Sequence, residues 1–563
     1  MKKGLLIAIL VLATLIILLA LGAGYMYLQL NREPDIPQHA FLQIDLSGYI
    51  PDIDMAMISK KVSFNDLWYH IERAKIDSRI KGIILRISYM NTGFARLDDI
   101  GRVINDFKRS GKKVYAFLEG GGIDEYYIAS FADKVCLFKG GNLFLKGLAT
   151  ETVFLKKTLA LLGIQAEFIH IGEYKTAANM FTEQSMTPSH KESIEKVVND
   201  VYDSTLKTIA VNRKLTVEGL KKICEDSPTD NRFYLDAKLV DAICYEDEIL
   251  KDNSEAYATV SFDTYQDTSS PLPYEGSDKI GVIFACGQIN ARRSGIQSLF
   301  GYPIMGSDTV SEQLQRMRTN PAIKAIVLRV DSPGGSASAS DMIRREVELT
   351  ARVKPVVVSM SDLAASGGYL IACASSKVLA LPQTLTGSIG VLSGKFVLKG
   401  LYDKLGISKE VVKTTGKADM FSDYRLYTPE ERKLVTEVME QLYKDFVGIV
   451  AKSRHLRFED AERIARGRVW SGATAQTLHL VDETGGLTDA IHAAKTLAHI
   501  PLSTPIGIVT LPKKKTFFEQ IMDLVESKFH ASESLPLETL YSQIDGYKTF
   551  FPAFMIPYKF TFE

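Results

Sequence analysis

The segment LAASGGYLIACASSKV, Leu363 to Val378, places a serine between a predicted strand and a predicted helix. The β-branched run Pro355–Val358 before it is typical of a buried strand. A hydroxyl at the start of the helix lies where free N–H groups favour developing negative charge. Gly367 and Gly368 follow Ser366 and leave room for a substrate carbonyl. The segment therefore predicts either a nucleophile or a capping serine in a tight turn.

This pattern occurs twice in the chain. YLIACASSKV, from Tyr369, matches YYIASFADKV, from Tyr126, with five of ten residues identical. KAIVLR, from Lys324, matches KGIILR, from Lys81, with four of six identical, and both pairs are 243 residues apart. An equal spacing in separate segments indicates an internal repeat. Because strand-like and helix-like segments alternate within each copy, the sequence predicts an α/β fold present twice.

The repeat and the composition divide the chain into five predicted segments. These are an N-terminal membrane anchor at residues 1–30, a first repeat at 31–262, a polar linker at 263–278, a second repeat at 279–500 and an extension at 501–563. The repeated motifs do not extend into the last segment, and its sequence indicates no role.

The N-terminus predicts a transmembrane helix. Lys2 and Lys3 precede an almost unbroken apolar run from Leu5 to Leu28, which is longer than the roughly 20 residues that span a bilayer. The positive-inside rule keeps the lysines in the cytoplasm, so the remaining chain is expected on the extracytoplasmic side of a bacterial inner membrane. A signal peptide cleaved near residues 22–24 is the alternative.

Charge and cysteine content exclude several classes of function. Lysine plus arginine equals aspartate plus glutamate, at 67 each, so no nucleic-acid partner is predicted. The five cysteines show no spacing typical of a metal site and are interpreted as buried thiols, with a disulfide open but unsupported. Without a dinucleotide fingerprint, a phosphate-binding loop or an HExxH motif, we expect no cofactor and no catalytic metal.

The two copies differ at the polar positions. The counterpart of Ser366 in the first copy is Ile123, whereas the first copy has Lys175 where the second has Ala418. This complementarity predicts one composite site, with Ser366 and Lys175 facing each other across the copies. Because a one-residue slip in the alignment would replace Ala418 by Lys417, Lys417 is the alternative partner.

These residues lie in motifs that resemble a known family. The motifs are RVDSPGGS (329–336), SGGY (366–369), LTGSIG (385–390), GEYK (172–175) and RVWSGATA (468–475). With them the chain resembles the long, tandem-repeat form of the signal peptide peptidase A family, serine peptidase family S49, in the ClpP/crotonase-like superfamily. The resemblance implies two repeats of the ββα spiral, a Ser366 nucleophile and a Lys175 general base. It also implies a membrane-bound homotetramer that degrades cleaved signal peptides and other apolar peptides.

Such a site has definite physical requirements. A lysine accepts a proton only as the neutral amine, so Lys175 must be buried to lower its pKa from an ordinary value near 10.4. Ser388 is the candidate to orient this amine without adding charge. The backbone N–H groups of Gly334 or Gly335 and of Gly367 are the candidates to receive the oxyanion of the attacked carbonyl.

Other interpretations account for less of the sequence. His170 ends an apolar run and is expected to be structural, since it lies in no motif with Ser366. Crotonase-like folds also occur in acyl-CoA enzymes, but the anchor, Ser366 and Lys175 count against that activity. A non-catalytic membrane scaffold is the remaining alternative.

Overall fold

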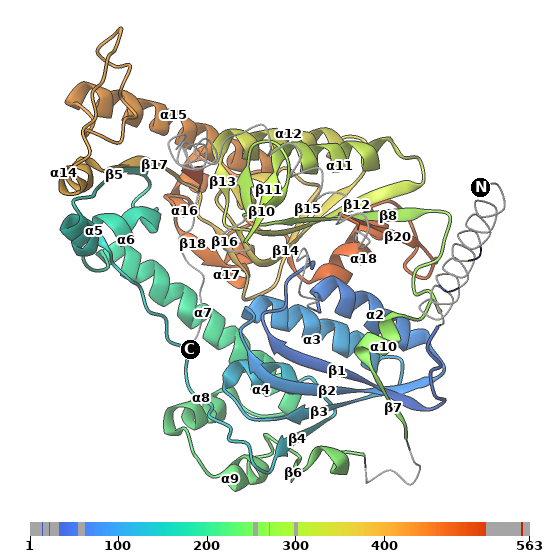
Figure 1. Ribbon diagram of the computed structural model, residues 1–563. Coiled ribbons are helices and arrows are strands. Elements are labelled where there is room, and N and C mark those ends of the chain that lie inside the picture. The colour runs from blue at the N-terminus through green and yellow to red at the C-terminus, as the bar shows by residue number, and fades with distance from the viewer. Residues whose placement is uncertain are drawn as a thin grey trace, which may run out of the picture.

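The computed structural model describes residues 33–54, 62–250, 257–269, 271–297, 302–513 and 553–554, together with residues 14 and 22. It contains two α/β units, which lie one above the other in Figure 1, and each is built on a mainly parallel sheet. The predicted α/β class is confirmed. The anchor predicted at 1–30 falls almost wholly outside the described residues, and no described helix has the length and hydropathy needed to cross a bilayer.

The first unit has six parallel strands in the order β6-β4-β3-β2-β1-β7. In the middle of strand β2, residues 82–85 form a continuous apolar run because both faces of the sheet are covered. Ile83 and Leu85 pack into the large core, and Ile84 packs into a smaller cluster on the other face. The strands are β1 (Ala40–Gly48), β2 (Ile80–Met90), β3 (Lys113–Leu118), β4 (Lys134–Phe138), β6 (Ala242–Cys244) and β7 (Thr259–Ser261).

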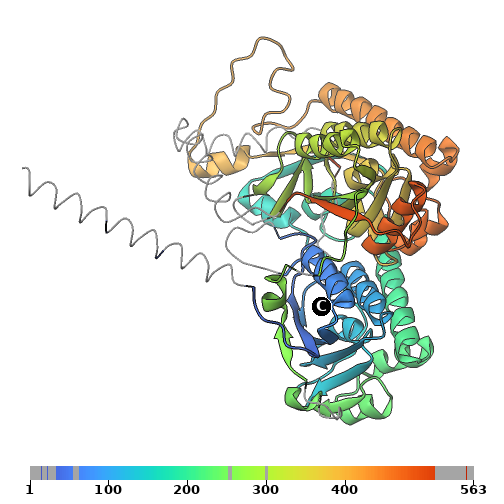
Figure 2. The same cartoon turned by 90° about the vertical axis from the view of Figure 1, so that its right-hand side faces the viewer.

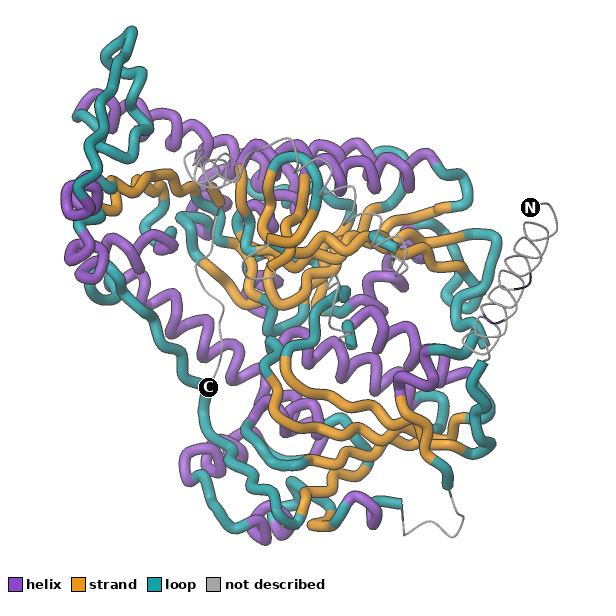
Figure 3. The backbone as a smooth tube through the Cα atoms, viewed as in Figure 1, coloured by secondary structure: helices purple, strands orange, loops and turns teal. Residues whose placement is uncertain are grey.

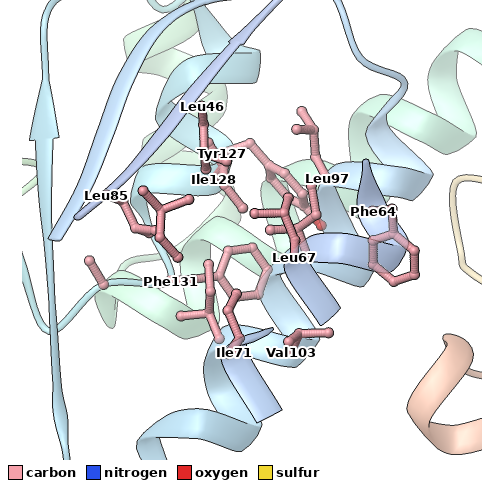
Figure 4. Packing of buried hydrophobic residues seen from close by; sticks show 14 of the residues in the cluster. Leu46, Phe64, Leu67, Ile71, Leu85, Leu97, Val103, Tyr127, Ile128 and Phe131 are labelled. Atoms are coloured by element: carbon pink, nitrogen blue, oxygen red, sulfur yellow. The ribbon is translucent and has the colours of Figure 1, made fainter. Parts of the chain in front are cut away.

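Three helices cover one face of this sheet, and two of them, α2 (Phe64–Ile76) and α3 (Phe94–Lys108), lie between the two units in Figure 1. The third is α4 (Ile123–Ala129). Figure 4 shows apolar side chains of the three helices meeting Leu46 and Leu85 of the strands. Ser63 caps α2 by accepting a hydrogen bond from the N–H of Asp66 at 3.1 Å. The core therefore holds α3 against the second unit.

The second unit repeats this arrangement in an eight-stranded sheet whose path is β18-β16-β14-β12-β8-β20. Strand β20 pairs with β8 as β7 pairs with β1 in the first unit. The boundary predicted at residue 500 is therefore too early, because β20 follows it and belongs to the sheet. The strands are β8 (Lys279–Cys286), β12 (Ile323–Ser332), β14 (Val356–Ala365), β15 (Lys377–Ala380), β16 (Leu385–Gly387), β18 (Val469–Ser471), β19 (Glu483–Thr484) and β20 (Gly507–Leu511).

A third sheet contains strands from both halves of the chain, in the order β10-β11-β9-β13-β21-β17-β5. Strand β5 (Gln165–Ile171) pairs antiparallel with β17 (Val391–Val397), and Ile169 faces Ser393. The tube in Figure 3 shows this sheet on the upper unit. Its other strands are β9 (Gln288–Asn290), β10 (Gly295–Gln297), β11 (Tyr302–Gly306), β13 (Gly335–Ser336) and β21 (Ala553–Phe554). The β5–β17 pairing brings the residues after β5 into the second unit.

Two long helices begin with the same N-terminal capping pattern. Helix α7 (Pro188–Arg213) and helix α15 (Pro429–Ser453) each begin with proline after a capping threonine. Thr187 accepts from the N–H of His190 at 3.3 Å, and Thr428 accepts from the N–H of Glu431 at 3.2 Å. Proline suits the first helical position because its missing N–H would have no partner there. Figure 2 shows the two helices on the same side of their respective units.

Candidate active site

Ser366 lies at the junction between β14 and α13 (Gly367–Cys373), as the sequence predicted. Its backbone has φ +58° and ψ −116°, a strained conformation for a residue with a side chain. The side chain is buried, and the N–H donates to the carbonyl of Gly387 at 2.8 Å. A Cβ on Gly367 would lie 2.4 Å from Ser340 Oγ, and one on Gly368 would lie 2.8 Å from Ser332 O. These two glycines are therefore required by close packing within the unit.

Lys175 reaches Ser366 from the first half of the chain. It follows β5, and its side chain is 1% exposed. Nζ lies 2.6 Å from Oγ of Ser366, 2.9 Å from the carbonyl oxygen of Ser388 and 3.0 Å from Oγ of Ser388. A neutral amine has two N–H groups and one lone pair, so it can donate to both oxygens of Ser388 and accept from the hydroxyl of Ser366.

The surroundings of this amine favour its neutral form. Desolvation lowers the pKa of Lys175 well below its ordinary value. All three hydrogen-bond partners of Nζ are hydroxyl or carbonyl oxygens, which carry no charge to offset the loss of water. The side chain thus meets the electrostatic condition for a lysine that accepts a proton near neutral pH.

Two residues directly before the RVWSGATA motif, Arg466 and Gly467, were not singled out from the sequence and help to support the lysine. Gly467 has φ +78°, and a Cβ on it would lie 2.5 Å from the Cβ of Lys175. The next residue, Arg468, accepts from the N–H of Ser388 at 2.7 Å, and Arg466 accepts from the N–H of Tyr174 at 2.9 Å. Residues 466–468 therefore separate and fix the two segments that meet at Nζ. The glycine directly before the RVWSGATA motif is the signal that could have indicated this contact.

The predicted oxyanion donors need one correction. The N–H of Gly334 donates to Ser332 Oγ at 3.1 Å, so it is already occupied within its own loop. Gly335 remains a candidate with Gly367, since a Cβ on Gly367 would lie 3.3 Å from the N of Gly335. Gly334 and Gly335 both lie beside Gly367, the residue after Ser366, but the N–H of Gly334 already has a partner.

The alternative residues lie apart from this contact. Lys417 is exposed on the segment between α14 (Lys399–Leu405) and α15. His170 is exposed on β5, where Nδ1 lies 3.1 Å from the carbonyl oxygen of Gly172. Neither residue is among the hydrogen-bond partners of Ser366, which are Lys175 and residues of its own unit.

Comparison with known proteins gives two matches to one family model. Residues 106–260 and 348–501 each match the model of peptidase family S49. The chain belongs to peptidase family S49. The serine protease SPPA, chloroplastic, of Arabidopsis thaliana is 31% identical over 497 residues, covering 86% of this chain and 73% of that protein. Protease 4 of Salmonella typhi is 32% identical over 457 residues, covering 78% and 72%. Protease 4 of Haemophilus influenzae is 28% identical over 522 residues, covering 83% and 81%.

These matches confirm the family predicted from the motifs and the presence of two repeats, and they identify the chain as a serine peptidase. In the first copy of this S49 peptidase, the residues that correspond to the serine site differ from those of the second copy. There Glu125 accepts from the N–H groups of Met90 and Gly122, each at 2.7 Å. Ile123 stands at the serine position, and burial raises the pKa of Asp124 to about 8. A carboxyl group thus occupies backbone donors in this copy.

Proposed function

We propose that this S49 peptidase is a membrane-anchored endopeptidase that cuts signal peptides and other apolar peptides with a Ser366/Lys175 dyad. The observation that carries the proposal is the 2.6 Å contact between Lys175 Nζ and Ser366 Oγ, in a buried site where no carboxylate of the described residues pairs with the lysine. Lysine alone then has to act as the base, and its burial suits that role.

The proposed reaction follows from these contacts. Nζ of Lys175 takes the proton of Ser366 as Oγ forms a bond with the peptide carbonyl carbon. The N–H groups of Gly335 and Gly367 are the proposed donors to the resulting oxyanion. As the carbon–nitrogen bond breaks, the Lys175 ammonium gives its proton to the leaving amine. Water then attacks the acyl-enzyme with Lys175 again as base, and Oγ of Ser366 is released with a proton.

Two features support an extended, apolar peptide as substrate. Strand β21 pairs antiparallel with β13 and contacts β17 through Leu392, so an extended backbone fits between these strands. Leu392 also packs with Ala177, Ala178 and Phe168 in a small apolar cluster, and Ala177 is two residues after Lys175. Backbone pairing with alternating side-chain contacts is a common mode of peptide recognition. Together with the apolar N-terminal run, this supports peptides released near a bilayer, on the extracytoplasmic side.

The internal repeat also supports a way for chains to associate. Strands β5 and β17 pair within one chain, and their counterparts in the other copies are residues 408–414 and 148–154. Neither counterpart forms a strand, and Val412 is 101% exposed although its counterpart Ile169 is 6% exposed. We propose that 408–414 of one chain pairs with 148–154 of the next. Such head-to-tail contacts close into a ring when the rotation between neighbouring chains is a simple fraction of a full turn. For the homotetramer expected here, each chain would be related to the next by a quarter turn.

Substitution of Val412 tests this association. Val412→Glu is expected to reduce the mass measured by light scattering of the full-length protein in detergent. Val353→Glu, at a valine that is 66% exposed elsewhere, serves as the control and is expected to keep the wild-type mass. A monomeric wild type, or an unchanged mass in Val412→Glu, would contradict the proposed pairing.

Cleavage of a fluorogenic apolar peptide tests the peptidase proposal itself. Ser366→Ala is expected to lose at least about 1000-fold in kcat, because the bond-forming atom is removed. Ser338→Ala removes an exposed hydroxyl near the same loop and is expected to keep full activity. Activity retained in Ser366→Ala would reject the dyad.

A further inference from the structure

Arg96, near the start of α3, is a buried cation that joins the first unit to the second. Its side chain is 0% exposed, and Nη2 donates to Oδ2 of Asp331 at 2.8 Å and to Oγ of Ser361 at 2.7 Å. Its backbone N–H donates to Oδ1 of Asp362 at 2.9 Å. All three acceptors belong to the second unit, so both the backbone and the side chain of Arg96 are tied to it.

These acceptors lie on the two segments that border Ser366. Asp331 precedes the loop that carries Gly335, and its Oδ1 accepts from the N–H of Leu363 at 3.2 Å. Leu363 lies on β14, three residues before Ser366. The carboxylate of Asp331 therefore joins the glycine loop to the serine strand, and Arg96 holds the second oxygen of that carboxylate.

The repeat indicates that this contact is specific to one copy. The counterpart of Arg96, 243 residues further on, is Ala339, and the counterpart of Asp331 is Ser88. Lys175 shows the same asymmetry, since its counterpart is Ala418. The first copy thus supplies two basic side chains to the second, the lysine at the serine and the arginine at the loop beside it.

We propose that Arg96 is a positioning residue for the serine site: by holding Asp331, it fixes the glycine loop relative to Ser366. The inference rests on the proposed function, since it requires Ser366 to attack the peptide and the Gly335 N–H to receive the oxyanion. Arg96 acts through the carboxylate of Asp331. A displacement of about 1 Å in such an arrangement can cost about 100-fold in rate.

The surrounding charges decide how the proposal is tested. Arg329 donates to Asp52 at 3.1 Å and forms an ion pair with Asp99 at 2.7 Å. Asp52 also accepts from Arg96 at 2.9 Å, so removal of Arg96 leaves buried carboxylates with one cation fewer. Loss of Arg96 is therefore expected to lower the stability of the protein and also to shift the glycine loop relative to Ser366. The experiment has to separate these two effects.

The test compares kcat, KM and the melting temperature of full-length Arg96→Met, Arg96→Lys and Asp331→Asn in detergent, each assayed well below its own melting temperature. Arg96→Met is expected to lower kcat about 100-fold with KM within about threefold of wild type, and Arg96→Lys to restore part of the loss. The control is Arg73→Met. Arg73 is also buried, but it donates to the carbonyls of Thr268 and Tyr265, each at 2.7 Å, within the first half of the chain. Arg73→Met is expected to lower the melting temperature and leave kcat unchanged.

A double variant supplies a measurement that a purely structural role would not change. If Arg96 acts through Asp331, the Arg96→Lys/Asp331→Asn protein is expected to lose no more kcat than the worse single variant. Fully additive losses would overturn the inference, as would wild-type kcat in both single variants while Ser366→Ala is inactive. An active Ser366→Ala would instead reject the proposed function. Should Arg96→Met fail to fold, the comparison of Arg96→Lys, Asp331→Asn and their double variant still shows whether Arg96 acts through Asp331.

Discussion

Replacement of Lys175 by methionine is expected to abolish activity and to stabilise the fold. Methionine has a similar length and no charge, so it fills the same space between the units. In the wild type, the partners of Nζ among the described residues are oxygens of Ser366 and Ser388, and none of these belongs to a carboxylate. Burial therefore disfavours the ammonium and lowers the pKa of Lys175 well below its ordinary value. Keeping this amine neutral in the folded protein lowers the free energy of unfolding.

The size of the effect follows from the protonation cost. Removing the proton from a lysine of ordinary pKa costs about 5 kcal/mol at pH 7, which is the upper limit of what methionine regains. Hydroxyls of Ser366 and Ser388 left without the amine cost roughly 1–3 kcal/mol. The variant is therefore expected to gain about 2–4 kcal/mol in the free energy of unfolding at pH 7.

The dependence on pH has a definite sign. Between the lowered pKa of folded Lys175 and about pH 10, the unfolded chain binds the lysine proton and the folded chain does not. Wild-type stability is therefore expected to rise with pH across this window. Lys175→Met lacks the group, so the difference between the two proteins is expected to shrink as pH rises toward 10.

Urea unfolding followed by circular dichroism at pH 7 and pH 9, with peptide cleavage measured in parallel, provides the assay. Lys417→Met is the control, because Lys417 is exposed and its loss is expected to leave both stability and activity unchanged. A Lys175→Met protein that is inactive but less stable than wild type at pH 7 would refute the reasoning. It would mean that the folded protein holds a charged lysine.

Three further predictions concern the surroundings of the lysine. Gly467→Ala is expected to lower kcat about 100-fold, because the new Cβ would meet the Cβ of Lys175. The matched control is Gly406→Ala, at a glycine with φ +70° and open space around it, and this variant is expected to keep the wild-type kcat. Ser388→Ala removes the 3.0 Å Oγ contact and keeps the carbonyl contact, so kcat is expected to fall about tenfold; an unchanged kcat would show that the hydroxyl does not matter. Finally, kcat/KM measured against pH is expected to rise and to level off well below pH 10.5, since only the neutral amine of Lys175 takes the proton from Ser366; a rate still rising at pH 10 would contradict a lysine base with a lowered pKa.

The sequence predicted much of the local structure because the two copies could be compared. The repeated segments from Lys81 and Lys324 lie in β2 and β12, and the strand–serine–helix order at Ser366 is present as expected. The asymmetry between the copies led to Lys175 and Ser366, which the structure places 2.6 Å apart. Their catalytic roles remain predictions. Patterns of this kind succeed because they depend on residues close together in the chain or on a repeat that aligns distant ones.

Other features depend on contacts that no local pattern reports. Gly334 was predicted as an oxyanion donor, but its N–H donates to the side chain of Ser332. This hydrogen bond depends on the conformation of the loop, which the sequence pattern does not report. The roles of Gly467 and Arg96 arise where segments several hundred residues apart meet. The end of the second repeat was placed too early because β20 has no conspicuous counterpart motif, although it pairs with β8.

Labelling with a fluorophosphonate, which reacts with an activated serine, tests the central claim most directly. Wild type, Ser366→Ala, Lys175→Ala and Lys417→Ala would be compared as full-length proteins in detergent. The account predicts labelling of wild type and Lys417→Ala, and none of Ser366→Ala or Lys175→Ala. Labelling of Lys175→Ala at the wild-type rate would contradict the account, because Ser366 would then be activated by a group other than Lys175.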